Sequence, residues 1–103
     1  MYKIAFFVPE SHLEAVKEAL FAAGAGTLGD YARCAWQIRG EGQFMPLAGA
    51  DPFTGSPGVL ERVPEFKVEM VCADDCIATA VAALRQAHPY ETPAYEVWPL
   101  ADF

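Results

Sequence analysis

The run His88-Pro89-Tyr90-Glu91 brings an imidazole, a phenol and a carboxylate together within four residues. With a neighbouring subunit, these groups could bind a metal ion or a small ligand. They also suit a purely structural role, in which His88 caps carbonyl groups, Tyr90 packs and Glu91 makes a hydrogen bond in a turn. Both interpretations stay open, and we favour the structural one. Glu10 is a further candidate for a ligand or interface contact.

A second set of candidate groups could hold a soft metal. His12 and Cys76 occupy the first turns of two predicted helices, and Cys72 lies four residues before Cys76. Together they would make a His-Cys-Cys set for a divalent cation, with His88 as another candidate ligand. The alternative, which we favour, is that these thiols are small buried side chains. A divalent metal is therefore the one cofactor that the residues suggest.

Other functional classes find little support in the sequence. No nucleophile is paired with a base, no phosphate-binding loop is present, and no Gly-x-Gly-x-x-Gly follows the first strand, so we do not expect an enzyme. The net charge of −7 argues against nucleic acid or an anionic membrane as the partner. No apolar run approaches a membrane span, and we recognise no signal peptide. Three cysteines without a Cys-x-x-Cys pair indicate free thiols in the cytoplasm.

The elements that must position these groups can be read from hydrophobic periodicity. Alternation predicts strands at 2–8, 31–40, 66–72 and 95–98. Ser11, three residues before Glu14, predicts a capping box at the start of the first helix, which Gly24 ends. Asp74 or Asp75 is expected to cap a second helix. That helix must end at His88, because Pro89 cannot continue it.

The chain contains an internal repeat. When the first unit is slid along until Tyr2 falls on Phe66, Lys3 falls on Lys67 and Tyr31 falls on Tyr95. The repeat units cover about 1–41 and 65–100 of a single domain, 1–103. Two strand-helix-strand units with right-handed crossovers predict an α+β, ferredoxin-like βαββαβ fold. It has a four-stranded antiparallel sheet with both helices on one face, and the first and third strands are central neighbours.

Two regions of this predicted fold are expected to meet partners. The helix-free face of the sheet carries Ala5, Phe7 and Val71, which are too apolar to stay in water, so we expect a homo-oligomer. The long segment 42–64 between the repeat units is rich in Gly and Pro, which predicts an irregular loop. Loops of this length are usually functional. This one either wraps a neighbouring subunit or contacts another protein.

Several motifs together resemble the small YqfO-type domain of Nif-three-like proteins, which is CutA-like and PII-like. The matching pieces cover nearly the whole chain: Val8-Pro9-Glu10, Ala22-Ala23-Gly24-Ala25-Gly26, Gly29-x-Tyr31, Gly42-Gln43-Phe44-x-Pro46-Leu47-x-Gly49-Ala50-x-Pro52, Glu61-x-Val63, Glu69 and His88-Pro89-Tyr90-Glu91-x-Pro93-Ala94-Tyr95.

This resemblance implies a fold that associates through its sheets, as trimers in CutA. In Nif-three-like proteins the domain is an insert, and the paired metals and any hydrolytic activity belong to a larger flanking domain. We therefore expect a small, cytoplasmic, homo-oligomeric domain with a binding or regulatory role. Two alternatives are a metal-tolerance protein of CutA type that binds divalent metal, and an accessory subunit of a separate Nif-three-like metal-dependent hydrolase.

Overall fold

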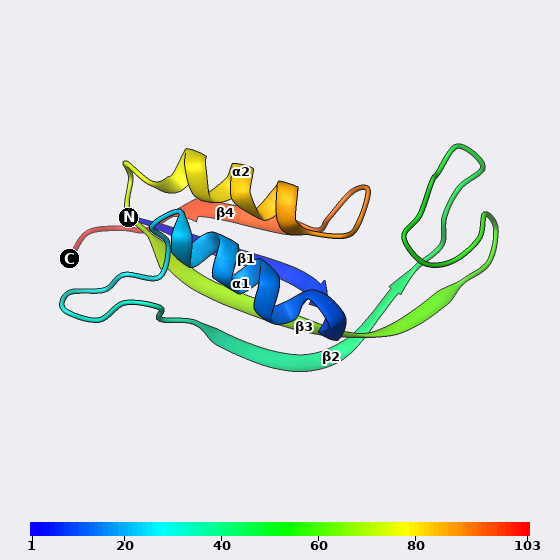
Figure 1. Ribbon diagram of the computed structural model, residues 1–103, viewed down its shortest axis with the longest axis horizontal. Coiled ribbons are helices and arrows are strands. Elements are labelled where there is room, and N and C mark those ends of the chain that lie inside the picture. The colour runs from blue at the N-terminus through cyan, green and yellow to red at the C-terminus, as the bar shows by residue number, and fades with distance from the viewer.

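The computed structural model describes residues 1–103 as a four-stranded antiparallel sheet with two helices on one face (Figure 1). The elements, in chain order, are β1 (Tyr2–Pro9), the short 3-10 helix η1 (Glu10–His12), α1 (Leu13–Ala22), β2 (Trp36–Phe44), β3 (Glu61–Cys72), α2 (Ile77–Ala87) and β4 (Tyr95–Pro99). The sheet order is β2-β3-β1-β4, so β1 and β3 are the central strands. This confirms the predicted ferredoxin-like fold. Neither helix has the length and apolar character needed to cross a membrane.

The core lies between the sheet and the helices, and alternation along the central strands creates it. One face of β1 and one face of β3 point at the helices, and α1 and α2 add their apolar stripes. Burying each large apolar side chain contributes about 1.5–3 kcal/mol relative to leaving it exposed. The fully buried large side chains are Phe6, Ile4, Leu20, Leu84, Val8, Val16, Val68 and Cys72.

The helix starts differ from the prediction, because neither helix has a side-chain cap. The turn η1 precedes α1, so Ser11 lies inside that turn, and its Oγ is 2.8 Å from Nδ1 of His12. At the start of α2, Asp74 pairs with the amino group of Met1 instead. Asp75 is 3.4 Å from the thiol of Cys76. The expected capping box and Asp cap are therefore both wrong.

The second strand also begins later than expected. Tyr31 was predicted to start it, by equivalence with Tyr95, but Tyr31 lies in a tight turn that hydrogen-bonds to Leu28. Gly29 has φ +57° and Arg33 has φ +61°, so the chain there is in the left-handed region and cannot form a strand. Pairing with β3 starts only at Trp36.

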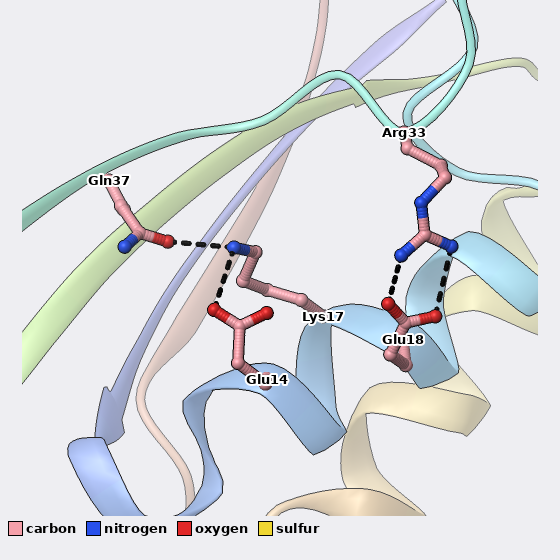
Figure 2. Close-up of polar contacts among 5 residues, drawn as sticks. All are labelled: Glu14, Lys17, Glu18, Arg33 and Gln37. Atoms are coloured by element: carbon pink, nitrogen blue, oxygen red, sulfur yellow. Dashed lines mark hydrogen bonds and ion pairs between the residues drawn. The ribbon is translucent and has the colours of Figure 1, made fainter.

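Polar contacts hold this irregular connection against α1 (Figure 2). The guanidinium of Arg33 forms two hydrogen bonds with the carboxylate of Glu18, and these lower the pKa of Glu18 and raise that of Arg33. Next to Glu18 in α1, Nζ of Lys17 donates to Oε1 of Glu14 at 3.2 Å and to Oε1 of Gln37 at 2.9 Å. Lys17 and Gln37 thus connect α1 directly to β2.

The β2–β3 hairpin projects beyond the rest of the fold (Figure 1) and gives the molecule extents of 46 × 24 × 24 Å. The irregular segment is 45–60, shorter than the expected 42–64, because both strands continue past the end of β1. Pro64 belongs to β3 and lies opposite Glu41 of β2. It is tolerated there because β1 pairs with β3 only from Glu65 onward, which leaves Pro64 at a free edge.

Candidate functional site

The turn after α2 is organised around the buried side chain of His88. The helix ends at Ala87, and His88 has φ −71° and ψ 135°, the extended conformation that a following proline favours. The residue is only 6% exposed. Its Nε2 is 2.7 Å from the carbonyl oxygen of Phe7, and its Nδ1 accepts a hydrogen bond of 3.1 Å from the amide of Tyr90. His88 therefore joins the end of β1 to the turn.

These two partners determine the protonation of the imidazole. A carbonyl only accepts and an amide only donates, so the hydrogen lies on Nε2 and Nδ1 is unprotonated. Burial lowers the pKa of His88, while the hydrogen bond to Phe7 and the charge of Glu65 act in the opposite direction. The folded state thus favours a neutral histidine.

Tyr90 connects the same turn to β3. Its hydroxyl donates a hydrogen bond of 2.9 Å to Oε2 of Glu65. Burial, followed by this hydrogen bond, raises the pKa of Tyr90, so the phenol stays protonated. The Tyr90 ring also lies 6.1 Å from the ring of Phe44 and 6.2 Å from that of Phe53, measured between centroids. Strand, turn and long loop therefore meet at one side chain.

The carboxylate of Glu65 can occupy its place only because β2 has a glycine there. A Cβ atom on Gly42 would lie 1.7 Å from Oε1 of Glu65, far inside van der Waals contact. Gly40, the residue paired with Glu65 in the hairpin, likewise has no side chain. Alternate glycines thus hollow out one face of β2.

Two contacts fold the long loop back onto the turn. The carboxylate of Glu91 accepts the amide hydrogen of Asp51, with distances of 3.2 and 3.4 Å to its two oxygens. The ring of Phe53 packs edge-on against the ring of His12, with centroids 5.5 Å apart. These contacts frame a half-open cavity of about 510 Å³ between the loop, the turn and the end of the sheet. Four aromatic rings and two carboxylates are among its walls: Phe7, Phe44, Phe53, Tyr90, Glu65 and Glu91.

The structure brings some of the sequence candidates together and separates others. Tyr90 and Glu91 line the cavity, and His88 lies directly behind Tyr90, with ring centroids 4.9 Å apart. Glu10 lies outside the cavity and forms an ion pair of 3.1 Å with Arg39. Sequence reasoning did not single out Glu65 or Phe53. The glycines at 40 and 42 were the available signal, since they leave one face of a strand empty.

The metal candidates do not form a cluster within one chain. His12 contacts Ser11 and Phe53, while Cys72 is a free thiol buried in the core. Cys76 is a half-buried free thiol beside Asp75. Burial raises the pKa of Cys72, and the contact with Asp75 raises that of Cys76, so neither thiol is activated. No group of three or more His, Cys, Asp or Glu side chains lies close enough together to hold a metal ion.

Known proteins resemble this chain over nearly its whole length. No family model matches it. A curated relative from Mycobacterium leprae, named GTP cyclohydrolase 1 type 2 homolog, is 47% identical over 98 residues, which are 95% of this chain and 26% of the relative. The protein of the same name from Halalkalibacterium halodurans is 44% identical over 102 residues, 99% of this chain and 27% of the relative. The chain therefore spans about a quarter of the length of these relatives.

Solved structures show the same similarity and add the fold. A Bacillus cereus protein related to NIF3 superposes with a TM-score of 0.83 at 39% identity, over 98% of this chain and 26% of that one. The periplasmic divalent cation tolerance protein CutA from Archaeoglobus fulgidus has a TM-score of 0.69 at 17% identity, over 100% of this chain and 87% of that one. At that identity the likeness to CutA concerns the fold alone. The chain therefore resembles, over nearly its whole length, a segment that makes up about a quarter of NIF3-related proteins, and it has the CutA-like and PII-like fold.

Proposed function

We propose that this chain is a non-catalytic binding or regulatory domain that self-associates through the helix-free face of its sheet. One observation carries the proposal: no helix covers that face, although apolar side chains lie on it among the charged side chains of Lys3, Lys67, Glu69 and Glu96. Strand register places six apolar side chains on it: Ala5, Phe7, Trp36, Ile38, Val71 and Trp98. We call these residues the helix-free face.

The exposure of this face contrasts with the opposite side of the same sheet. Trp36 is 56% exposed, Ile38 is 53% exposed and Trp98 is 38% exposed, whereas Ile4, Phe6 and Val8, on the side of β1 that faces the helices, are fully buried. Apolar area removed from water stabilises an assembly by roughly 25 cal/mol per Å², so covering two tryptophans and an isoleucine favours association. We propose a trimer, because the resemblance to CutA implies one.

The assembly can be tested by sedimentation equilibrium at micromolar concentration, where the protein should exceed its monomer mass of 11.2 kDa. Trp36→Glu and Ile38→Glu should each shift it toward monomer, because a buried unpaired carboxylate is costly. Leu28→Glu is the matched control, since Leu28 is 54% exposed but lies outside the helix-free face. A monomeric wild type, or equal effects of all three variants, would contradict the proposal.

A second candidate role is that of an accessory domain for a larger Nif-three-like domain. It rests on the observation that the curated relatives contain this segment as about a quarter of their length. We propose that any activity of the kind those relatives are named for resides in the larger part. A pull-down of the large domain of a relative by this chain tests the idea, with the Trp36→Glu variant run in parallel. Failure to retain the large domain under any condition would sink it.

A further inference from the structure

The cavity beneath the long loop is lined by aromatic rings and by two carboxylates. Its volume of about 510 Å³ falls in the range of sites for small organic molecules. The only charged side chains in its lining are the carboxylates of Glu65 and Glu91, and no Lys or Arg is present there. An occupant must therefore be compatible with negative charge at two positions.

Both carboxylates retain free capacity to accept hydrogen bonds. Glu65 receives one hydrogen bond, from Tyr90 to Oε2, and Glu91 receives one amide hydrogen, from Asp51. An ionised carboxylate offers about four acceptor sites. The absence of a side chain at Gly42 leaves the room that Oε1 of Glu65 occupies. Each carboxylate can thus accept a further, charge-assisted hydrogen bond from an N–H donor.

The remaining walls suit the apolar body and the charge of an organic cation. The rings of Phe7, Phe44, Phe53 and Tyr90 line the cavity, and the ring of Tyr90 is paired with those of Phe44 and Phe53. Aromatic faces attract ammonium and guanidinium groups through their quadrupoles, most strongly where water is excluded. An anion would face both carboxylates and find no cationic partner.

We propose that this cavity binds a small organic cation, an ammonium or guanidinium group on an apolar body, held by Glu65 and Glu91 against the aromatic walls. The cation enters beneath the loop segment that Glu91 and His12 anchor through Asp51 and Phe53. This inference goes beyond self-association, and it can fail while the assembly proposal stands, because its test changes Glu65 and Glu91, whereas the assembly test changes Trp36 and Ile38.

The test compares three probes with the same apolar body and different charges: 4-phenylbutylammonium, 4-phenylbutanol and 4-phenylbutyrate. Each is titrated into the full chain, with affinity from NMR line positions and the site from the ring resonances of Phe53 and Tyr90. The ammonium should bind roughly tenfold more tightly than the alcohol, the ratio expected from one charge-assisted hydrogen bond. The carboxylate should bind most weakly. Added salt should weaken only the ammonium.

Variants that remove one negative charge test whether Glu65 and Glu91 bind the ammonium group. Glu91→Gln should reduce the preference for the ammonium over the alcohol by at least about fivefold without affecting folding, because Glu91 is exposed. Glu65→Gln should act in the same direction, and its amide oxygen can still accept from Tyr90. Glu41→Gln is the matched control: Glu41 lies on the same hairpin but pairs with Pro64 and does not line the cavity. Its preference should stay within about twofold of wild type.

Three results would overturn the proposal. One is equal binding of all three probes, or tighter binding of the carboxylate. Another is no binding of the ammonium at millimolar concentration while the folded spectrum is intact. The third is binding by the Trp36→Glu monomer but not by the assembled wild type, which would show that a second copy of the chain fills the cavity.

Discussion

The two helices end at equivalent places in the repeat, but they end by different means. Gly24-Ala25-Gly26 follows α1, and His88-Pro89-Tyr90 follows α2 at the corresponding positions. The first end is closed by backbone alone: Gly24 has φ +100°, its amide bonds the carbonyl of Phe21, and the amide of Ala25 bonds the carbonyl of Leu20. The second end is closed by the side chain of His88, which reaches the carbonyl of Phe7 in β1.

This difference accounts for the position of the cavity. At the first end a Cβ on Gly24 would meet the thiol of Cys76 at 2.8 Å, and one on Gly26 would meet the ring of Phe21 at 2.8 Å. The backbone there is packed too closely to leave space. At the second end Tyr90 projects toward β3 and the long loop, and an open volume remains beneath it. The two helix ends thus differ, and the cavity lies at the end that a side chain closes.

The largest effect should come from His88→Ala. Removing the ring leaves the Phe7 carbonyl and the Tyr90 amide without partners and creates a cavity beside the core. We expect a loss of about 2–4 kcal/mol in the free energy of unfolding, measured by urea denaturation. His12→Ala is the control and should change it by less than about 1 kcal/mol, because His12 is only half-buried and its partners Ser11 and Phe53 are exposed. Equal effects at both histidines would show that burial of His88 contributes little.

Gly24→Ala probes the other helix end and should have a smaller effect. The new Cβ would be in a backbone conformation with φ +100° and only 2.8 Å from Sγ of Cys76, so we expect a loss of about 1–3 kcal/mol. Gly29→Ala has φ +57° but nothing within 4 Å, so it measures backbone strain alone. Thermal melts should rank Gly24→Ala below Gly29→Ala in stability. If Cys76→Ala does not recover part of the loss, the thiol clash is not its cause.

The sequence predicted the fold better than the site because the two depend on different kinds of information. Alternation in β1 and β3 and the helical stripes are local patterns, and they led to the strand order and the shared helix face. Pro89 alone was enough to place the end of α2. The start of β2 was missed because the left-handed Arg33 has no signature in its residue type.

The site required contacts between residues far apart in the chain. His88 bonds to Phe7 across 81 positions, Tyr90 to Glu65 across 25, and Glu91 to Asp51 across 40. No local pattern shows which strand residue a turn side chain will reach. His88, Tyr90 and Glu91 could be selected by type and spacing, but Glu65 and Phe53 depend on how the hairpin bends and where its loop returns.

The pH dependence of stability should show a smaller effect, which comes from the helix end that His88 closes. The pKa of His88 is lowered in the folded protein, chiefly by burial, from an ordinary value of 6.5. Above that value the ring is neutral in both states, and its contribution is complete. As the pH falls below 6.5 the unfolded chain takes up the proton first, so stability decreases until the folded pKa is passed. Urea midpoints between pH 7.5 and 5 should show this decrease, and His88→Ala should lack that component. An unchanged slope in the variant would assign the decrease to other groups.

The smallest effect should come from Pro89→Ala, which tests whether Pro89 or the buried ring of His88 determines where α2 ends. Proline restricts the unfolded chain and favours the extended conformation of His88, so its loss should cost about 0.5–1 kcal/mol. The helix should still end at Ala87, because continuing it would withdraw the His88 ring from Phe7 and break both of its hydrogen bonds. Backbone chemical shifts at residues 86–91 can show this directly. In the double variant with His88→Ala that restraint is gone, and the shifts should show α2 extending past residue 88. Helix extension in Pro89→Ala alone would mean that proline, and not the buried imidazole, defines this end of the repeat.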